Sequence, residues 1–368
     1  MIRVMVVDDS ALVRKIATDI LSADEGISVV ATAAQGEFAL QKLTREVPDV
    51  ITLDIEMPGM GGLETIRQIM AVRPTPIIVL SAHAARGANL TLQALELGAV
   101  DFVSKPANSL SGGIPAIARE LVEKVKGAAR IGVHGQQTQP AQCEVSALRP
   151  VSSVPPQIAR SDWTDGYSLV AIGTSTGGPV ALKTVLTGLP ADLPVGVVVV
   201  QHMPPVFTKA FAERLDSCCQ VRVKEAENGD AILPGRVLLA PGNWHMTVSR
   251  FGAEPHVELN QDGGVNGHRP SVDVLMHSVA MEYGAQAVGV IMTGMGKDGA
   301  EGLRELHKRG GYIIAQDKES SVIYGMNKEV AQNGNAHEVV SVEAIAGRIQ
   351  ERLCASLRGS RNEAYAKR

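Results

Sequence analysis

Over the first 125 residues, short apolar segments alternate regularly with longer amphipathic segments. Strand-like runs occur at Ile2–Val7, Ser28–Ala33, Val50–Leu53, Pro76–Leu80 and Asp101–Val103. Helical patterns follow them at Ser10–Ala23, Gly36–Glu46, Gly62–Val72, Asn89–Leu97 and Ile114–Val125, with Ser10 as the cap of the first helix. Five such units with apolar strands predict a doubly wound parallel sheet covered by helices on both faces.

A second α/β pattern follows a break. Residues 127–165 are polar, rich in Gln and Pro and without a hydrophobic period, which predicts an interdomain linker. Apolar runs then return at Ser168–Ile172, Val195–Val200, Arg236–Leu239, Ala287–Met292 and Tyr312–Ala315, with hairpin-like material at Met246–Leu259. Since 368 residues exceed one ordinary core, we expect two doubly wound α/β domains, at 1–126 and 166–357, and a charged tail at 358–368.

Composition narrows the class of protein. The net charge of −4 gives no sign of a surface for nucleic acid or membrane lipid. The N-terminus lacks the pattern of a signal peptide, and no apolar run approaches the roughly 20 residues of a membrane span. The four cysteines, Cys143, Cys218, Cys219 and Cys354, have neither CxxC nor Cys/His metal spacing. These features predict a cytoplasmic protein with reduced thiols.

Three acidic residues follow the strands of the first pattern. Asp8 and Asp9 come after the first strand, and Asp54 after the third. Because the carboxyl ends of parallel strands share one edge of a sheet, these carboxylates should converge there. Their mutual repulsion requires a cation, and a hard divalent ion such as Mg²⁺ is the expected one.

Two further residues complete this predicted site. Ser81 follows the fourth strand, and Lys105 follows the fifth, next to Pro106. Together with the metal they form a site that accepts a phosphoryl group on Asp54, with Lys105 neutralising phosphate oxygens. Ser81 and Phe102 would relay the added charge to the outer face. Taken singly, each residue has a plainer explanation as a helix cap or solvated loop residue. Their combination at one edge of the sheet argues against that explanation for all of them together.

The second pattern contains a glycine-rich turn, Gly173–Pro179, between a strand and a helix. Glycines permit the sharp turn that lifts the Ser175 hydroxyl clear of the sheet, and the helix N-terminus offers N–H groups to an oxyanion. A phosphate-binding turn of a nucleotide domain has a similar sequence. That fold, however, would place an acid after the next strand, where this chain has Gln201 and His202.

A third strand of this pattern ends near Asp298. Ser175, His202 and Asp298 should therefore meet at one sheet edge as nucleophile, base and orienting carboxylate. His245 and His268 are rivals for the base, and the residues alone leave the choice open. Asp298 has an alternative role as a helix N-cap, and the neighbouring Lys297 would lower its pKa.

The motifs resemble two known families. Asp8-Asp9, Asp54 within the segment 54–59, Ser81 and Lys105-Pro106 resemble the receiver domain of response regulators. The segments 172–178, 201–204, 268–273 and 293–299 resemble the chemotaxis protein-glutamate methylesterases, and the similarity spans almost the whole chain. The resemblance implies a flavodoxin-like receiver and a Rossmann-like serine-hydrolase domain.

The resemblance also implies roles. It assigns the catalytic roles to Ser175, His202 and Asp298, the oxyanion-hole amides to Thr176 and Met295, and a metal-binding backbone group to Glu56. It implies hydrolysis of glutamate methyl esters, and deamidation of glutamines, on methyl-accepting chemotaxis receptors. A histidine kinase would donate the phosphoryl group, the esterase would need no cofactor, and membrane association would occur only through the receptors.

Two other classes of protein could also carry a receiver-like domain. A DNA-binding response regulator would carry a basic output domain, but residues 166–357 contain 16 Lys and Arg against 20 Asp and Glu, a net charge of 16 − 20 = −4. A scaffold that only binds receptors would not need Ser175, so its replacement by Ala distinguishes the two.

Overall fold

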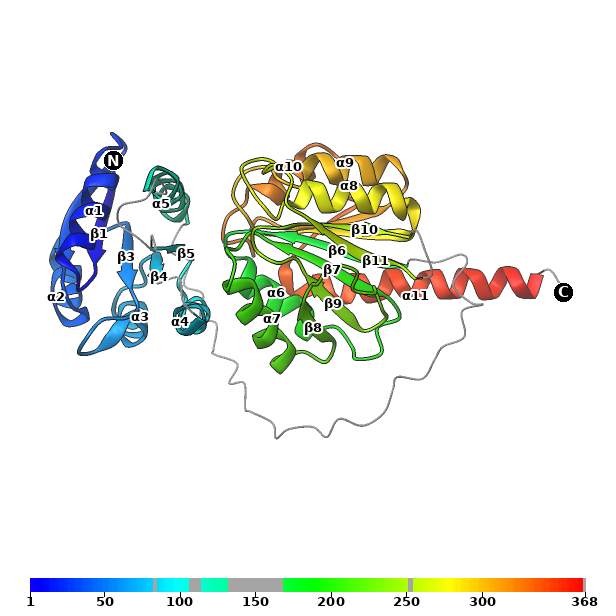
Figure 1. Cartoon of the computed structure of the whole chain (residues 1–368), viewed down its shortest axis with the longest axis horizontal. Helices are drawn as coiled ribbons and strands as arrows, with labels where there is room; N and C mark the ends of the chain where they lie inside the picture. The colour runs from blue at the N-terminus through cyan, green and yellow to red at the C-terminus, as the bar shows by residue number, and fades with distance from the viewer. Residues whose placement is uncertain (82–84, 106–113, 132–167, 251–253, 367–368) are drawn as a thin grey trace.

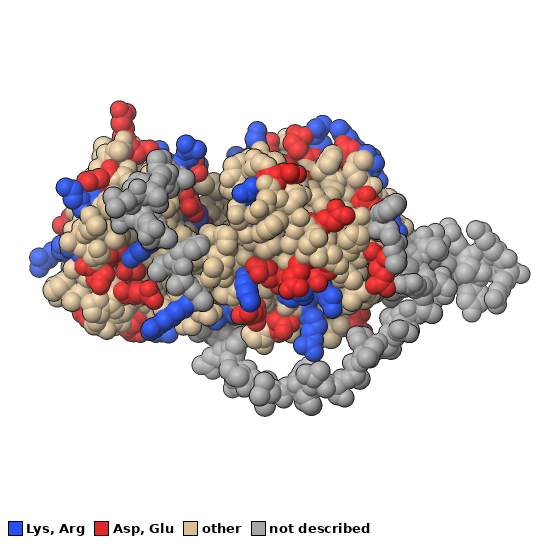
Figure 2. All heavy atoms as spheres, viewed as in Figure 1, with Lys and Arg blue, Asp and Glu red and all other residues tan. Residues whose placement is uncertain are grey.

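The computed structural model describes residues 1–81, 85–105, 114–131, 168–250 and 254–366. Most of the predicted linker, together with Pro106 and Cys143, therefore lies outside the described residues. No helix in the described part of the chain is long and apolar enough to cross a membrane. Acidic and basic side chains are interspersed on the face shown in Figure 2.

The first unit is a five-stranded parallel sheet in the order β2-β1-β3-β4-β5. Its strands are β1 (Ile2–Val7), β2 (Ile27–Ala33), β3 (Val50–Asp54), β4 (Ile77–Ser81) and β5 (Asp101–Ser104). Its helices are α1 (Ala11–Ser22), α2 (Gly36–Glu46), α3 (Gly61–Val72), α4 (Ala85–Glu96) and α5 (Ile114–Ala128). The sequence prediction is confirmed, including the cap, since the Ser10 side chain accepts a hydrogen bond from Val13 N.

The second unit is a seven-stranded parallel sheet in the order β14-β13-β12-β6-β7-β9-β8. Its strands are β6 (Leu169–Thr174), β7 (Gly196–Gln201), β8 (Arg222–Glu225), β9 (Arg236–Leu239), β12 (Ala287–Ile291), β13 (Tyr312–Gln316) and β14 (Glu338–Val340). The predicted hairpin is confirmed as β10 (His245–Ser249) paired antiparallel with β11 (His256–Asn260). The sequence prediction missed the short edge strands β8 and β14.

Helices cover both faces of the second sheet. One layer contains α8 (Val272–Glu282), α9 (Ala300–Lys308) and α10 (Met326–Gln332), and the other contains α6 (Gly178–Thr187), α7 (Phe207–Cys218) and α11 (Val342–Ala366) (Figure 1). A one-turn helix, η2 (Gly284–Gln286), precedes β12. Helix α11 includes most of the segment expected as a charged tail.

Alternation along β6 builds both apolar layers. Val170 and Ile172 join the cluster on the α6/α7 side, whereas Leu169 and Ala171 join the cluster on the α8/α9 side. Since successive strand residues point to opposite faces, a continuous apolar run is what a strand buried on both faces requires. The turn after β6 is thereby fixed at the centre of the sheet.

The two units contact each other directly. The α4, β5 and α5 elements of the first unit face the second unit (Figure 1). Glu96, at the end of α4, accepts hydrogen bonds from Lys183 of α6 at 2.8 Å and from Arg214 Nε of α7 at 3.0 Å. The Phe102 ring of β5 stacks on Phe207 of α7, with 4.6 Å between centroids.

Candidate functional sites

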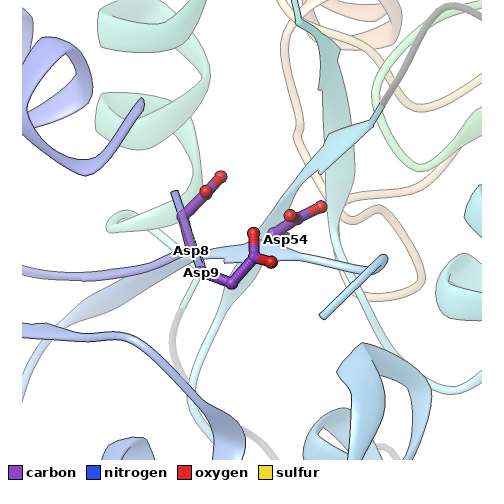
Figure 3. A group of neighbouring side chains, drawn as sticks. All are labelled: Asp8, Asp9 and Asp54. Atoms are coloured by element: carbon purple, nitrogen blue, oxygen red, sulfur yellow. The ribbon is translucent and has the colours of Figure 1, made fainter. Parts of the chain in front are cut away.

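Three carboxylates gather at the ends of the adjacent strands β1 and β3. Ligand oxygens of Asp8, Asp9 and Asp54 all lie within 4.8 Å of one another, and Figure 3 shows the three side chains grouped there. Asp8 and Asp54 are buried, while Asp9 is exposed. The backbone N–H of Glu56 donates to Asp54 Oδ1 at 3.2 Å, so the Glu56 backbone lies beside the group. These hard oxygen donors fit Mg²⁺.

Lys105 bridges two of the carboxylates. Its Nζ lies 2.8 Å from Asp8 Oδ2 and 2.8 Å from Asp54 Oδ2. Burial would lower the pKa of Lys105, but the bonds to Asp54 and Asp8 outweigh burial and raise it. Burial also raises the pKa of Asp8, and the charge of Asp54 adds to this effect, so Lys105 does not compensate fully. One ammonium facing three carboxylates leaves negative charge for a divalent cation.

Ser81 and Phe102 lie farther along the same sheet. Ser81 is buried at the end of β4, and its Oγ accepts a 2.6 Å hydrogen bond from the Thr91 hydroxyl. Phe102 is buried at the interface with α7. Ser81 therefore lies near the acidic group, and Phe102 lies at the contact between the units. A relay of charge from one to the other requires this placement. The relay itself stays a prediction.

Ser175 lies where three strand ends of the second sheet meet. Its backbone N–H donates to Thr293 O at 3.0 Å, and His202 N donates to Thr174 O at 3.1 Å. A Cβ on Gly294 would come within 2.8 Å of the Ser175 Cβ, so only glycine fits there. The ends of β6, β7 and β12 are thus tied to one another around the serine.

His202 and Asp298 form a buried pair beside Ser175. His202 Nε2 lies 2.7 Å from Asp298 Oδ2, and the two side chains are 7% and 1% exposed. Four other groups donate to this carboxylate: Asn266 Nδ2, Ser271 Oγ, Val272 N and Asp273 N. Two of these donors are the first amides of α8, so the helix N-terminus also stabilises the negative charge.

The pKa of Asp298 lies well below its usual range. Burial would raise it, but the hydrogen bond and charge of His202 and the hydrogen bonds from Asn266 and Ser271 outweigh burial. Lys297 is exposed and is not among the main causes, so the prediction that it lowers this pKa is not supported. The α9 N-cap is Gly299, which leaves the Asp298 side chain to His202 and α8.

The remaining nitrogen of His202 is the one available to the serine. Nδ1 is buried and has no hydrogen-bond partner among the described residues. An imidazole that donates Nε2–H to a carboxylate carries its free lone pair on Nδ1. Ser175 is 9% exposed, and among the described residues no hydrogen bond joins its hydroxyl to this nitrogen. Such bonds often tighten only with substrate bound.

The two rival histidines differ from His202. His245 is buried, its Nδ1 accepts from Ser271 N at 3.2 Å and its Nε2 lies 3.1 Å from Gly263 O. Both of its nitrogens are therefore used by the backbone. The His268 ring stacks on His202 and has no hydrogen bond with Asp298 among the described residues. Of the three candidates, His202 is the one bonded to the carboxylate.

Thr176 and Met295 flank the serine. Ser175 N is already bonded, but neither Thr176 N nor Met295 N donates a hydrogen bond to another backbone group among the described residues. Free amides beside a serine suit an oxyanion. The Thr176 hydroxyl donates to Asp101 Oδ2 of β5, so the first unit contacts the serine turn directly.

The sequence patterns did not predict several residues that contribute to these sites. Asn266, Ser271 and Asp273 support Asp298, and Asp101 and Glu96 make the contact between the units. Ser271 carried a usable signal, since a Ser before an apolar helical pattern is a typical N-cap, and its side chain does accept from Val274 N. The roles of the other residues depend on contacts between distant parts of the chain, and no local sequence pattern indicates them.

Comparisons with known proteins agree with this architecture. Residues 170–349 match the CheB methylesterase family, and residues 4–111 match the response regulator receiver domain. The protein-glutamate methylesterase/protein-glutamine glutaminase of Symbiobacterium thermophilum is 46% identical over 350 residues, covering 95% of this chain and 96% of the relative. The relative of the same name from Paraburkholderia xenovorans is 43% identical over 354 residues, covering 96% of each.

A solved structure supports the assignment of the second unit. The Thermotoga maritima CheB methylesterase catalytic domain matches with a TM-score of 0.50 and 41% identity, covering 50% of this chain and 98% of that one. Two parallel α/β units, one with a receiver-type acidic group, define a response regulator joined to an enzyme domain. The chain belongs to the CheB methylesterase family, which confirms the resemblance found in its motifs.

Proposed function

We propose that this chain is a phosphorylation-activated esterase that hydrolyses glutamate methyl esters, and deamidates glutamines, on methyl-accepting chemotaxis receptors during sensory adaptation. The names of the relatives support the reaction class. Residues 1–126 would act as the receiver and 166–357 as the catalytic domain, joined by the linker 127–165. The protein would work in the cytoplasm and approach the membrane only through its receptors.

The observation that carries the proposal is the buried His202–Asp298 pair beside Ser175. In the proposed reaction the Ser175 oxygen attacks the ester carbonyl while His202 Nδ1 takes the hydroxyl proton. The carbonyl oxygen gains negative charge, and the N–H groups of Thr176 and Met295 stabilise it. Asp298 stabilises the imidazolium that forms.

Breakdown of this intermediate completes the reaction. His202 returns the proton to the departing oxygen, so methanol leaves and an acyl-serine remains. Water then attacks with His202 again as base, which frees glutamate and restores the Ser175 hydroxyl. A glutamine substrate would follow the same steps with ammonia as the leaving group. The esterase steps need no cofactor.

The receiver would control access to this site. Its residues Asp101 and Phe102 contact Thr176 and Phe207, and a Cβ on Gly127 of α5 would lie 3.5 Å from Met295 Sδ. While these contacts hold, a receptor helix would be kept from Ser175. A histidine kinase would phosphorylate Asp54, and the change would spread through Ser81 and Phe102 to favour an open arrangement. Four groups would hold Mg²⁺: the carboxylates of Asp8, Asp9 and Asp54 and the backbone of Glu56. When bound, the ion would neutralise the oxygens of the incoming phosphoryl group.

The test is methanol release from methylated receptor membranes by the full chain, with and without acetyl phosphate. We expect acetyl phosphate to stimulate release and Ser175→Ala to abolish it with the fold retained, a loss of at least about 10⁴-fold. Undiminished release by Ser175→Ala would refute the serine mechanism. A scaffold that acts only by binding would show no release with either protein.

A further inference from the structure

A second imidazole lies flat against the proposed base. The rings of His202 and His268 are stacked, with 3.8 Å between centroids and 14° between planes. His268 belongs to the loop before α8 and has no role in the proton transfers described above. A parallel contact this close covers one face of the His202 ring.

His268 presents this face as a neutral ring. The pKa of His268 is lowered to about 4, mainly by burial and then by the positive charges of His202 and of Lys124 from α5, while the charge of Asp298 opposes this effect. Among the described residues, these three are the groups whose charge acts on the His268 ring. Near neutral pH two adjacent imidazoliums are thus avoided, and only His202 changes its charge during turnover.

The turn that carries His268 is firmly held. Val265 N donates to His268 O at 3.1 Å, and His268 N donates to Val265 O at 2.9 Å. Between them, Asn266 Nδ2 donates to Asp298 Oδ1 at 2.9 Å and to Asp273 Oδ2 at 2.7 Å. One short turn therefore contacts both members of the catalytic pair, the carboxylate through a hydrogen bond and the imidazole through a ring face.

The His202 ring needs such support. Its Nε2 bond to Asp298 is its one side-chain hydrogen bond among the described residues, since Nδ1 has no partner. A single hydrogen bond fixes one atom of the ring but leaves the plane free to tilt about that atom. A flat contact on the ring face removes this freedom, and small errors in the placement of a reacting group reduce rates strongly.

We propose that His268 is a positioning residue for this esterase: its ring face fixes the plane of His202 so that Nδ1 stays available to the Ser175 hydroxyl. The same face stabilises the imidazolium that forms during turnover, because an aromatic ring attracts a cation placed over it. This inference rests on the proposed function. It assigns to His268 a role in the chemical step and none in substrate binding.

Substitutions in the full chain test this role, assayed with acetyl phosphate on receptor membranes. His268→Phe keeps a flat aromatic face and should hold kcat within about threefold of the unsubstituted chain. His268→Leu and His268→Gln remove the face and should lower kcat by about 10- to 100-fold with KM unchanged. His277→Leu, at an exposed position of α8, is the matched control and should change neither constant.

The pH profile adds a readout that packing alone would not move. His268→Lys places a permanent cation near His202 and opposes its protonation. The acid limb of the kcat/KM profile should therefore shift to lower pH, whereas His268→Phe should leave it in place. An unshifted limb in a folded, active His268→Lys protein would contradict a direct interaction between the two side chains.

Two results would overturn the inference. One is a kcat for His268→Leu within about threefold of the unsubstituted chain. The other is rescue by Gln but not by Phe, which would assign a hydrogen-bonding role instead. The labelling rate of Ser175 by an organophosphonate, measured on the same proteins, separates this failure from a failure of the proposed function: it reports serine activation even if receptor membranes release no methanol.

Discussion

Asp8 and Asp298 are both buried carboxylates at the carboxyl edges of parallel sheets, yet their pKa values move in opposite directions. Burial raises the pKa of Asp8, which Lys105 compensates only in part because Asp54 adds repulsion. Burial acts on Asp298 as well, but His202, Asn266 and Ser271 outweigh it. The first site lacks positive charge and suits an incoming cation, whereas the second supplies its own partners.

The two sites also differ in how exposed they are to solvent. Asp9 is exposed beside the acidic group, so an ion or a small phosphodonor can reach it. Ser175, His202 and Asp298 are nearly inaccessible, and the first unit contacts the serine turn through Asp101. The same kind of sheet edge thus gives an open site for small reagents and a covered site for a large one.

Loss of the Asp298 charge should reduce activity most strongly. Asp298→Asn keeps the shape but removes the charge that supports the His202 imidazolium. We expect kcat for methanol release to fall by about 10⁴-fold, without any change in the Mg²⁺ response of the receiver. Asp317→Asn, at a position after β13, is the control. A loss below tenfold would show that the carboxylate does not support the base.

Metal removal should affect only the other site. Chelation of Mg²⁺ should abolish the stimulation by acetyl phosphate, which we expect to be on the order of tenfold, and leave the unstimulated rate intact. The measurement is methanol release with and without EDTA, followed by addition of Mg²⁺ in excess. If the unstimulated rate also falls, the second site is not independent of metal.

The contact between the first unit and the catalytic domain can be weakened by replacing Glu96. Burial would raise the pKa of Glu96, but hydrogen bonds from Arg214 and Lys183 hold it below its usual value, so the carboxylate is charged at the interface. Glu96→Gln should raise the unstimulated rate about three- to fivefold, a modest effect because the side chains are partly exposed. Glu301→Gln, on the exposed surface of α9, should leave that rate unchanged. An unaltered rate for Glu96→Gln would argue against the receiver as the cover.

The fold of both units was predictable because parallel strands buried on both faces leave continuous apolar runs, as at Val50–Asp54 and Gly196–Gln201. Edge strands were not predictable from the sequence, because they are short and partly exposed. Strand β14, for example, has three residues and no fully buried position. The strand ends that carry Asp8, Asp54, Ser175 and His202 followed from this topology. The residues that contact these side chains could not be predicted in this way. Asn266 lies in an exposed glycine-rich loop without a hydrophobic period, and the partner of Asp101 belongs to the other domain.

Replacement of Asp8 should change the stability of the protein only slightly, but this change tests the charge difference between the two sites directly. Because folding raises the pKa of Asp8 above its ordinary value of 3.8, the folded protein binds that proton more readily than the unfolded one. Stability therefore falls as pH rises through this window, and at pH 7 the penalty is fully present. Without Mg²⁺, Asp8→Asn should raise the free energy of unfolding by about 1 kcal/mol.

Added Mg²⁺ should reverse the order of the two proteins. The ion stabilises the folded state in proportion to its affinity, and Asp8→Asn removes one of its ligands. Urea unfolding of both proteins at pH 7, with and without Mg²⁺, measures this, and Asp262→Asn at an exposed loop position controls for loss of negative charge. If Asp8→Asn destabilises the metal-free protein, Lys105 already balances the acidic group, and the two strand-end sites do not differ in the way their charges indicate.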